Sequence, residues 1–234
     1  MRVFETKRTR LVNAIKKLEG LVGYWKMDEI SGNAVSSAPS SLGGLPGTTN
    51  GAMAQGNTGQ RGRSFLFDSI NDQVDFGNIV TSASKLTIIF FWYPTENSGT
   101  DQETIIGYGN SRWYFIYGDS TTKMRFSIKS TTEKNTGNTT FTPSLNTWYM
   151  IVGAYDPAGG TNNLVIRIYR NGLQEEKAAT KTGTIDASAT SLRMGQDTLR
   201  SSFIGGRAQH VAVLDNVFLT EKQTSRIAHI AGFA

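Results

Sequence analysis

The 234-residue sequence contains no cysteine. A disulfide framework and a zinc site with thiolate ligands are therefore excluded, and no covalent cross-link stabilises the folded state. Histidine is almost as scarce, since His210 and His229 are the only two. A zinc site built on histidine and a Ser-His-Asp triad consequently have little support, and we expect both histidines to be packing or surface residues.

Long hydrophobic stretches are also missing. The chain nowhere contains 18 consecutive apolar residues, and residues 1–20 hold no apolar run of the length that a signal peptide needs. The sequence therefore predicts neither a membrane partner nor export. We expect a cytoplasmic protein, or one that is carried in a virion.

Most of the positive charge lies at the N-terminus. The net charge is +5, but residues 1–20 hold six basic and two acidic side chains, which leaves about +1 for the remaining chain. A nearly neutral body argues against a broad phosphate-binding face, so no nucleic-acid partner is expected. We interpret residues 1–20 as a basic arm that precedes the main domain.

The arm has helical periodicity. Phe4, Leu11, Ile15 and Leu18 recur at helical spacing with cations between them, and Gly20 is a natural stop, which predicts an amphipathic helix over residues 3–19. Two roles for its apolar stripe stay open: packing on the chain's own body, or docking on a partner. In the second case the contact residues would be Arg2, Phe4, Lys7, Arg8, Leu11 and Ile15.

From residue 21 onward the pattern is that of an all-β protein. Short segments rich in β-branched and aromatic residues alternate with turn residues, and the chain has 25 glycines. Asn171-Gly172 predicts a hairpin turn, residues 31–63 are expected to be a surface loop with at most one short strand, and residues 220–232 a terminal helix. The predicted strands are residues 22–27, 65–67, 74–76, 86–93, 104–107, 113–117, 124–128, 148–155, 164–170, 192–195 and 208–214.

The order of several loose motifs resembles one family. They include LVGYWKMDE at residues 21–29, SFLFD at 64–68, the strand at 86–94, IYRNG at 168–172 and FIGG at 203–206. In this order the motifs resemble the laminin-G-like family, whose relatives are the concanavalin A-like lectins and the pentraxins, over residues 21–232. The resemblance implies one domain, residues 21–234, folded as a two-sheet antiparallel jelly-roll β-sandwich that binds glycans or proteins.

Some members of this superfamily are glycoside hydrolases, which flank the scissile bond with two carboxylates. Such enzymes place the acidic residues alternately along one strand, whereas Glu175-Glu176 follows the hairpin turn and Asp28-Glu29 follows a strand. The sequence therefore predicts that the protein is not an enzyme. A polysaccharide-active glycoside hydrolase with carboxylates from separate elements remains the alternative, as does an adhesin domain that is secreted by an unconventional route.

The resemblance to pentraxins also implies a calcium site, because calcium binds several hard oxygen ligands from rim loops. The matching residues depart from the family pattern, since Gln102 and Gln196 stand where charged ligands often appear and Gln209 stands for an aspartate of the final strand. The alternative is that these are solvated turn residues. The candidate metal ligands are Asp101, Gln102, Gln196 and Asp197, with Glu103 beside them as a metal or glycan ligand.

Glycan sites stack aromatic rings on sugar rings, so each tryptophan matters. Trp25, Trp92 and Trp148 occupy framework positions of the family and are expected in the core. Trp113 and Tyr117 share one face of a strand, and with Glu103 they form the candidate ligand-binding set; a buried core strand is the alternative.

The function that combines these features is a non-enzymatic lectin-like binding module, acting as a structural or adhesive component of a larger assembly. One such assembly is a phage virion, in which a decoration or appendage protein would bind glycans or neighbouring capsid proteins. The expected partners are a glycan or protein surface, virion proteins that contact the arm, and further copies of the chain in a homo-oligomer. The fold itself does not identify the ligand.

Overall fold

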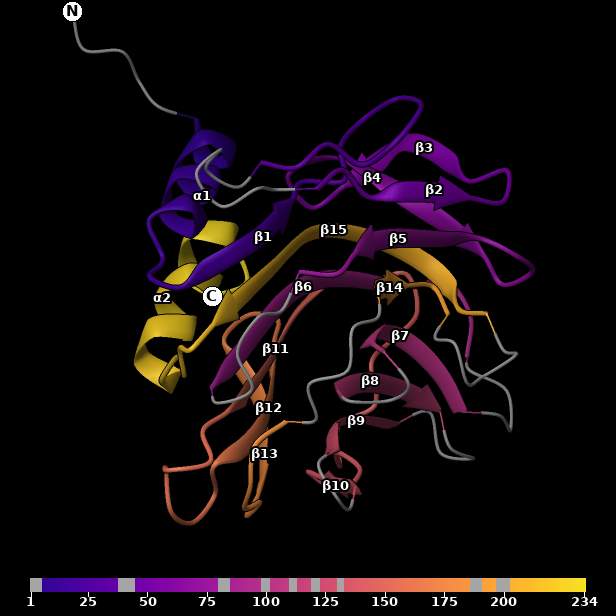
Figure 1. The fold of residues 1–234 in the computed structure, drawn as a ribbon. Coiled ribbons are helices and arrows are strands. Elements are labelled where there is room, and N and C mark those ends of the chain that lie inside the picture. The colour runs from indigo at the N-terminus through magenta and orange to yellow at the C-terminus, as the bar shows by residue number, and fades with distance from the viewer. Residues whose placement is uncertain are drawn as a thin grey trace, which may run out of the picture.

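The computed structural model describes residues 6–37, 45–79, 85–97, 102–109, 113–118, 123–129, 133–185, 191–196 and 203–234. These residues form two antiparallel sheets and two helices, one near each end of the chain (Figure 1). The predicted all-β sandwich with two terminal helices is confirmed. No helix in these ranges is both long and apolar enough to cross a membrane.

The first sheet has eight strands. Their order is β13-β12-β11-β6-β15-β4-β3, and β1 pairs with the second half of β15. The strands of this eight-stranded sheet are β1 (Leu21–Trp25), β3 (Ala54–Gly59), β4 (Gly62–Asp68), β6 (Leu86–Pro94), β11 (Tyr149–Tyr155), β12 (Leu164–Tyr169), β13 (Leu173–Ala179) and β15 (Gly205–Asp215).

The second sheet has seven strands in the order β10-β9-β8-β7-β14-β5-β2. The strands of this seven-stranded sheet are β2 (Thr48–Asn50), β5 (Gln73–Gly77), β7 (Gln102–Tyr108), β8 (Trp113–Gly118), β9 (Lys123–Lys129), β10 (Glu133–Asn135) and β14 (Leu192–Met194).

Residues 31–63 contain more strand than the single short one that the sequence suggests. Both β2 and β3 lie there, paired with β5 and β4 respectively. Their side chains are polar or small and no residue of either strand is buried. Backbone hydrogen bonding to a neighbouring strand is enough to form such an edge strand, so hydrophobic alternation gives no signal for it.

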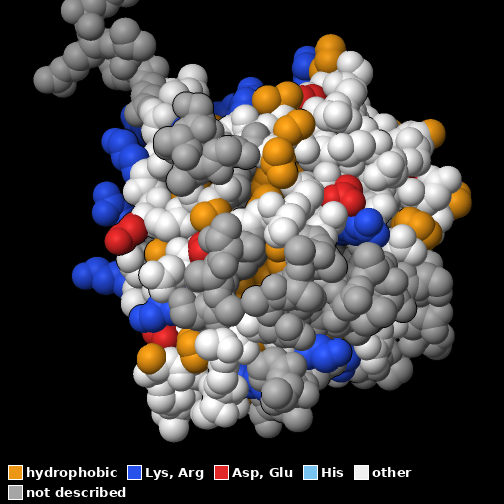
Figure 2. Space-filling view, in the orientation of Figure 1, with side chains coloured by type: hydrophobic (Ala, Val, Ile, Leu, Met, Phe, Trp, Pro, Cys, Tyr) orange, Lys and Arg blue, Asp and Glu red, His pale blue; other side chains and the backbone are white. Residues whose placement is uncertain are grey.

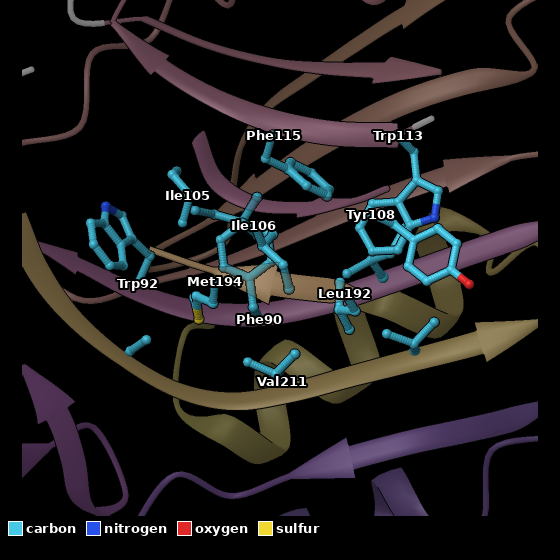
Figure 3. Packing of buried hydrophobic residues seen from close by; sticks show 14 of the residues in the cluster. Phe90, Trp92, Ile105, Ile106, Tyr108, Trp113, Phe115, Leu192, Met194 and Val211 are labelled. Carbon is cyan, nitrogen blue, oxygen red and sulfur yellow. The ribbon is translucent and has the colours of Figure 1, made fainter. Parts of the chain in front are cut away.

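The main core lies between the two sheets. Trp25 packs on Phe76 with ring centroids 4.3 Å apart, and Phe90 of β6 meets Phe115 of β8 edge-on at 4.9 Å. Figure 3 shows aromatic and aliphatic side chains from both sheets interleaved in this layer. At Gly153 in β11 a side chain is excluded, because a Cβ there would collide with the ring of Phe115.

A second core covers the outer face of the eight-stranded sheet. The helices α1 (Lys7–Lys16) and α2 (Glu221–Ala231) lie side by side there (Figure 1). Ile89 and Phe91 of β6 belong to this second core, whereas their neighbours Ile88 and Phe90 belong to the first. Because β6 is buried on both faces, it is a nearly continuous apolar run rather than an alternating one.

Both predicted helices are present. In α1 the Thr6 side chain caps the first turn by accepting from the Thr9 N–H (3.2 Å), and Leu11 and Ile15 are fully buried. The apolar stripe therefore packs on the chain's own body, the first of the two alternatives. In α2 Thr220 forms a capping box with Gln223, and Gly232 ends the helix in the left-handed conformation.

The predicted hairpin between β12 and β13 is also confirmed. Asn171 and Gly172 both have positive φ, at 52° and 99°, as this kind of turn requires. The pairing register shifts between Ile168 and Tyr169, so the turn includes an irregularity beyond the simple two-residue form.

Candidate functional site

The predicted aromatic ligand face is wrong. Trp113 is fully buried and Tyr117 is 1% exposed. Trp113 stacks on Tyr108 inside the sandwich, with ring centroids 5.8 Å apart (Figure 3). The face of β8 that carries these rings turns toward the eight-stranded sheet, so the alternative of a buried core strand is the correct one.

Glu103 is likewise inside the protein. It is 9% exposed and lies opposite Tyr117 in the β7–β8 pairing. Burial raises the pKa of Tyr117 to about 12, and the charges of Glu103, Tyr149 and Glu96 contribute in the same direction. In this acidic cluster Glu103, Tyr117 and Tyr149 are buried, whereas Glu96 is half-buried.

Two of the four candidate calcium ligands, Gln102 and Gln196, lie within the described residues. Gln102 accepts a hydrogen bond from Nη2 of Arg125 (2.9 Å), and Gln196 is half-buried, while Asp101 and Asp197 lie outside the described residues. Gln209 is fully buried and ties β15 to the β3–β4 turn through the backbone of Arg61 and Arg63. Within the described ranges, no three His, Asp or Glu side chains are placed to hold a metal ion.

The arm residues divide into two kinds. Leu11 and Ile15 contact the chain's own strands and α2, so their side chains are covered. Lys7 and Arg8 are exposed, and Arg8 forms an ion pair with Asp28. Arg2 and Phe4 lie outside the described residues. Of the histidines, His210 is fully buried and His229 is exposed, as predicted.

A pocket of about 270 Å³ lies on the side of the eight-stranded sheet where β6 ends and β11 begins. We call it the aromatic pocket because the half-buried rings of Tyr93 and Trp148 are its largest exposed groups. Its lining consists of Gln60, Tyr93, Asn146, Thr147, Trp148, Arg170, Asn171, Gly232 and Phe233.

Five segments that are distant in sequence build this pocket, and backbone contacts hold them together. The N–H of Asn146 donates to the carbonyl of Pro94 (2.8 Å), which fixes the turn before β11 against the end of β6. The N–H of Gly172 donates to the carbonyl of Phe233 (2.6 Å), which joins the β12–β13 hairpin to the segment after α2. The walls are therefore set by the fold rather than by one flexible loop.

The chemistry of the lining suits a polar ligand with apolar faces. The ring centroids of Tyr93 and Trp148 lie 5.3 Å apart, and the ring planes are tilted by 48°. Arg207, which does not line the pocket, places its guanidinium 5.1 Å from the centre of the Tyr93 ring. Asn146 and Asn171 are exposed and supply amide donors and acceptors. Stacking rings combined with a few planar hydrogen-bonding groups is an arrangement that recognises sugars.

Sequence reasoning missed this pocket because it assigned Trp148 to the core. Trp148 immediately precedes β11, and its ring covers only the margin of the second core, so it stays half-buried. The available signal was its position: it follows Asn146-Thr147, a turn, and so stands at a strand end rather than inside the strand.

Comparison with known proteins supports a lectin-like fold. A family model described as the concanavalin A-like lectin/glucanases superfamily matches residues 68–223. No curated protein matches the sequence.

Solved structures with the same fold include three that were determined with a glycan or sugar. Domain 4 of AbnA, an extracellular arabinanase from Geobacillus stearothermophilus, in complex with arabinotriose, has a TM-score of 0.65 at 14% identity; the match covers 89% of this chain and 98% of that domain. The binding domain of botulinum neurotoxin DC in complex with SialylT has a TM-score of 0.63 at 11% identity, covering 90% of this chain and 52% of that one. The sialidase of Trypanosoma rangeli in complex with sialic acid has a TM-score of 0.63 at 9% identity. This match covers 96% of this chain and 37% of the sialidase chain. At these identities the likeness concerns the fold alone.

Proposed function

The chain belongs to the concanavalin A-like lectin/glucanase superfamily, and from this membership we propose that it is a non-enzymatic glycan-binding module whose ligand occupies the aromatic pocket. One observation carries the proposal: Tyr93 and Trp148 present half-buried rings in a pocket that also offers Asn146, Asn171 and Arg170. The aromatic rings would stack on sugar faces, and the amides would bind hydroxyl groups.

The lining of the pocket favours binding without hydrolysis. Among the described residues that line it, none is acidic. Both mechanisms of glycoside hydrolysis need two carboxyl groups that flank the scissile bond. A glycan held against Tyr93 and Trp148 would therefore be bound and released unchanged.

Substitution of the two rings tests the proposal. The Trp148→Ala and Tyr93→Ala variants would be compared with wild type by titration calorimetry against a panel of neutral oligosaccharides that includes arabinotriose. We expect at least one glycan to bind wild type and to lose about tenfold or more in affinity in each variant, equivalent to about 1.4 kcal/mol. Phe218→Ala is the matched control, because Phe218 is also half-buried but lies outside the pocket. Unchanged affinity in both pocket variants would refute this assignment.

A glycoside hydrolase is the second candidate, and the acidic cluster around Tyr117 favours it. The charges of Glu96 and Glu103 both raise the pKa of the Tyr117 hydroxyl. Glu96 follows β6 and Glu103 lies in β7, so the two carboxylates come from separate elements, as a glycoside hydrolase of this kind would require. Release of reducing ends from a polysaccharide panel by wild type, but not by Glu103→Gln, would support hydrolysis. Absence of product in wild type would support the binding module.

A place in a larger assembly completes the proposal. We propose that the glycan-binding body is carried as a decoration of a particle such as a phage virion, with the basic arm as its anchor. The nearly neutral body and the charged arm support this view. Cross-linking in the native particle should join the arm to a capsid neighbour, whereas recovery of the protein only from the cell surface would favour the adhesin alternative.

A further inference from the structure

A second pocket, of about 280 Å³, lies beside the aromatic pocket and is rich in cations. We call it the basic pocket. Lys7 and Arg10 reach it from α1, Arg61 from the β3–β4 turn, and His229 from α2; the rest of its lining is Ile230, Gly232 and Ala234. Figure 2 shows several Lys and Arg side chains along the edge of the molecule where Figure 1 places the two helices.

No carboxylate side chain of the described residues forms an ion pair with the Lys and Arg side chains of the basic pocket. Nearby, Arg8 and Lys26 share the carboxylate of Asp28. Lys7, Arg10 and Arg61 form no ion pair with any residue in the described part of the chain. Three like charges around one hollow repel one another, and an anion placed between them would relieve that repulsion.

Hydrogen bonds fix the backbone of Arg61. Gln209 is fully buried and bonds both the N–H and the carbonyl of Arg61, at 3.1 Å and 2.8 Å. The guanidinium lies over Gly232, where a Cβ would collide with it. Its Nε is buried and has no hydrogen-bond partner among the described residues, so no acceptor of the described part of the chain holds that nitrogen.

The two pockets share a wall. Gly232 lines both of them, and the consecutive residues Gln60 and Arg61 line one each. We propose that the protein binds acidic glycans, with the carboxylate or sulfate group in the basic pocket and the neutral part of the sugar against Tyr93 and Trp148. This inference rests on the proposed function. Arginine suits the role because its planar fork of donors matches carboxylate and sulfate oxygens.

Matched pairs of ligands test the inference. Calorimetry at roughly 20 mM salt, where screening is weak, would compare an oligogalacturonate with its carboxyl-reduced form, and a sulfated galactan oligosaccharide with its desulfated form. We expect at least one acidic ligand to bind about tenfold or more tightly than its neutral partner, and this advantage to shrink as salt is added. The two pairs show whether the preferred group is a carboxylate or a sulfate.

Two variants then test whether the acidic group of the ligand binds in the basic pocket. Arg61→Gln should remove the acidic advantage and leave the affinity for the neutral form unchanged. Arg226→Gln is the control, since it removes an exposed arginine of α2 that does not line either pocket. Equal binding of the acidic and neutral forms by wild type would overturn the inference, and so would an advantage that persists in a folded Arg61→Gln protein, as checked by thermal unfolding.

The outcomes separate the two proposals. If Trp148→Ala abolishes neutral binding and wild type shows no acidic preference, the aromatic pocket stands and the basic pocket is wrong. If Arg61→Gln abolishes binding that Trp148→Ala leaves intact, the basic pocket is an anion site and the proposed glycan pocket is wrong.

Discussion

The phenolic oxygen of Tyr24 lies 2.8 Å from Nδ1 of His210, and both side chains are fully buried. This contact joins β1 to β15 under the two helices, at the point where the β15–β6 register shifts between Gln209 and Ala212. His210 has a φ of 53° there, and Phe91 packs on its ring with centroids 5.0 Å apart. Among the described residues Tyr24 is the one hydrogen-bond partner of the imidazole, and its Nε2 is buried without a partner.

Acid should weaken the fold through His210. Burial lowers the pKa of His210 to about 3, with smaller contributions from Arg8, Lys26 and Arg61, whereas in the unfolded chain it is about 6.5. Between these values the unfolded state binds more protons, so the stabilisation is complete above about pH 6.5 and is lost as the pH falls toward 3, at up to about 1.4 kcal/mol per pH unit. Urea unfolding at several pH values measures this slope.

The variant His210→Asn isolates the effect, because Asn tolerates positive φ and does not titrate. Its stability should fall less steeply with acid than that of wild type. Asp72 has the opposite effect on stability in acid, because burial and then the charge of Asp68 raise its pKa to about 6. Asp72 is present in both proteins, so its contribution to the pH dependence cancels when the two stability curves are compared. Parallel stability curves would show that His210 does not cause the acid sensitivity.

Truncation of Ile15 tests whether the arm is part of the folded body. Ile15 is fully buried in the second core with residues of α2 and the sheet, so Ile15→Ala should lower the free energy of unfolding by about 2–5 kcal/mol. Lys16→Ala, one residue away and exposed, should change it by no more than about 0.5 kcal/mol. Equal stability of the two variants would mean that the arm detaches in solution.

A side chain at residue 153 should overpack the main core. In Gly153→Ala the new Cβ meets Phe115 and the ring of Phe126, at 3.0 Å from Phe126 Cδ1. We expect a loss of about 1–3 kcal/mol in the free energy of unfolding. Because the closest collision is with the ring of Phe115, Phe115→Leu should be less damaging in the Gly153→Ala background than in wild type. Additive effects in this double-mutant cycle would contradict the packing described.

Chelation should leave glycan binding intact. The aromatic pocket has no acidic lining residue, and the carbonyl oxygen of Gln102, a candidate calcium ligand, already accepts from the cationic Arg125. Calcium prefers several negatively charged or carbonyl oxygens. We expect affinities with EDTA and with added calcium to agree within about twofold. Binding that EDTA abolishes and calcium restores would place the glycan at a metal site instead.

The strands were predictable where a hydrophobic or aromatic run ends at turn residues. β6, β11 and β12 are examples, and the Asn171-Gly172 turn was predictable because few residues tolerate positive φ. The edge strand β10 was not predicted, and for β2 and β3 only one unplaced short strand was expected, because pairing with a neighbour forms these strands and their side chains give no pattern.

The candidate site could not be predicted in the same way. A strand pattern shows that Trp113 and Tyr117 share a face, but it does not show which face meets the other sheet. The tertiary structure turned those rings inward and left Trp148 half-buried beside Tyr93, 55 residues earlier in the chain. Contacts at such separations depend on the register of several strands together.

The sequence by itself determined the fold class, both helices and the location of the excess positive charge, because these follow from local periodicity, turn chemistry and composition. Only the tertiary structure decided that the arm's apolar stripe is covered by its own sheet and that Arg61 lies beside α1 and α2. It also decided which aromatic rings remain accessible. The physical reason is that burial depends on what packs against a surface, and here the packing partners come from opposite ends of the chain.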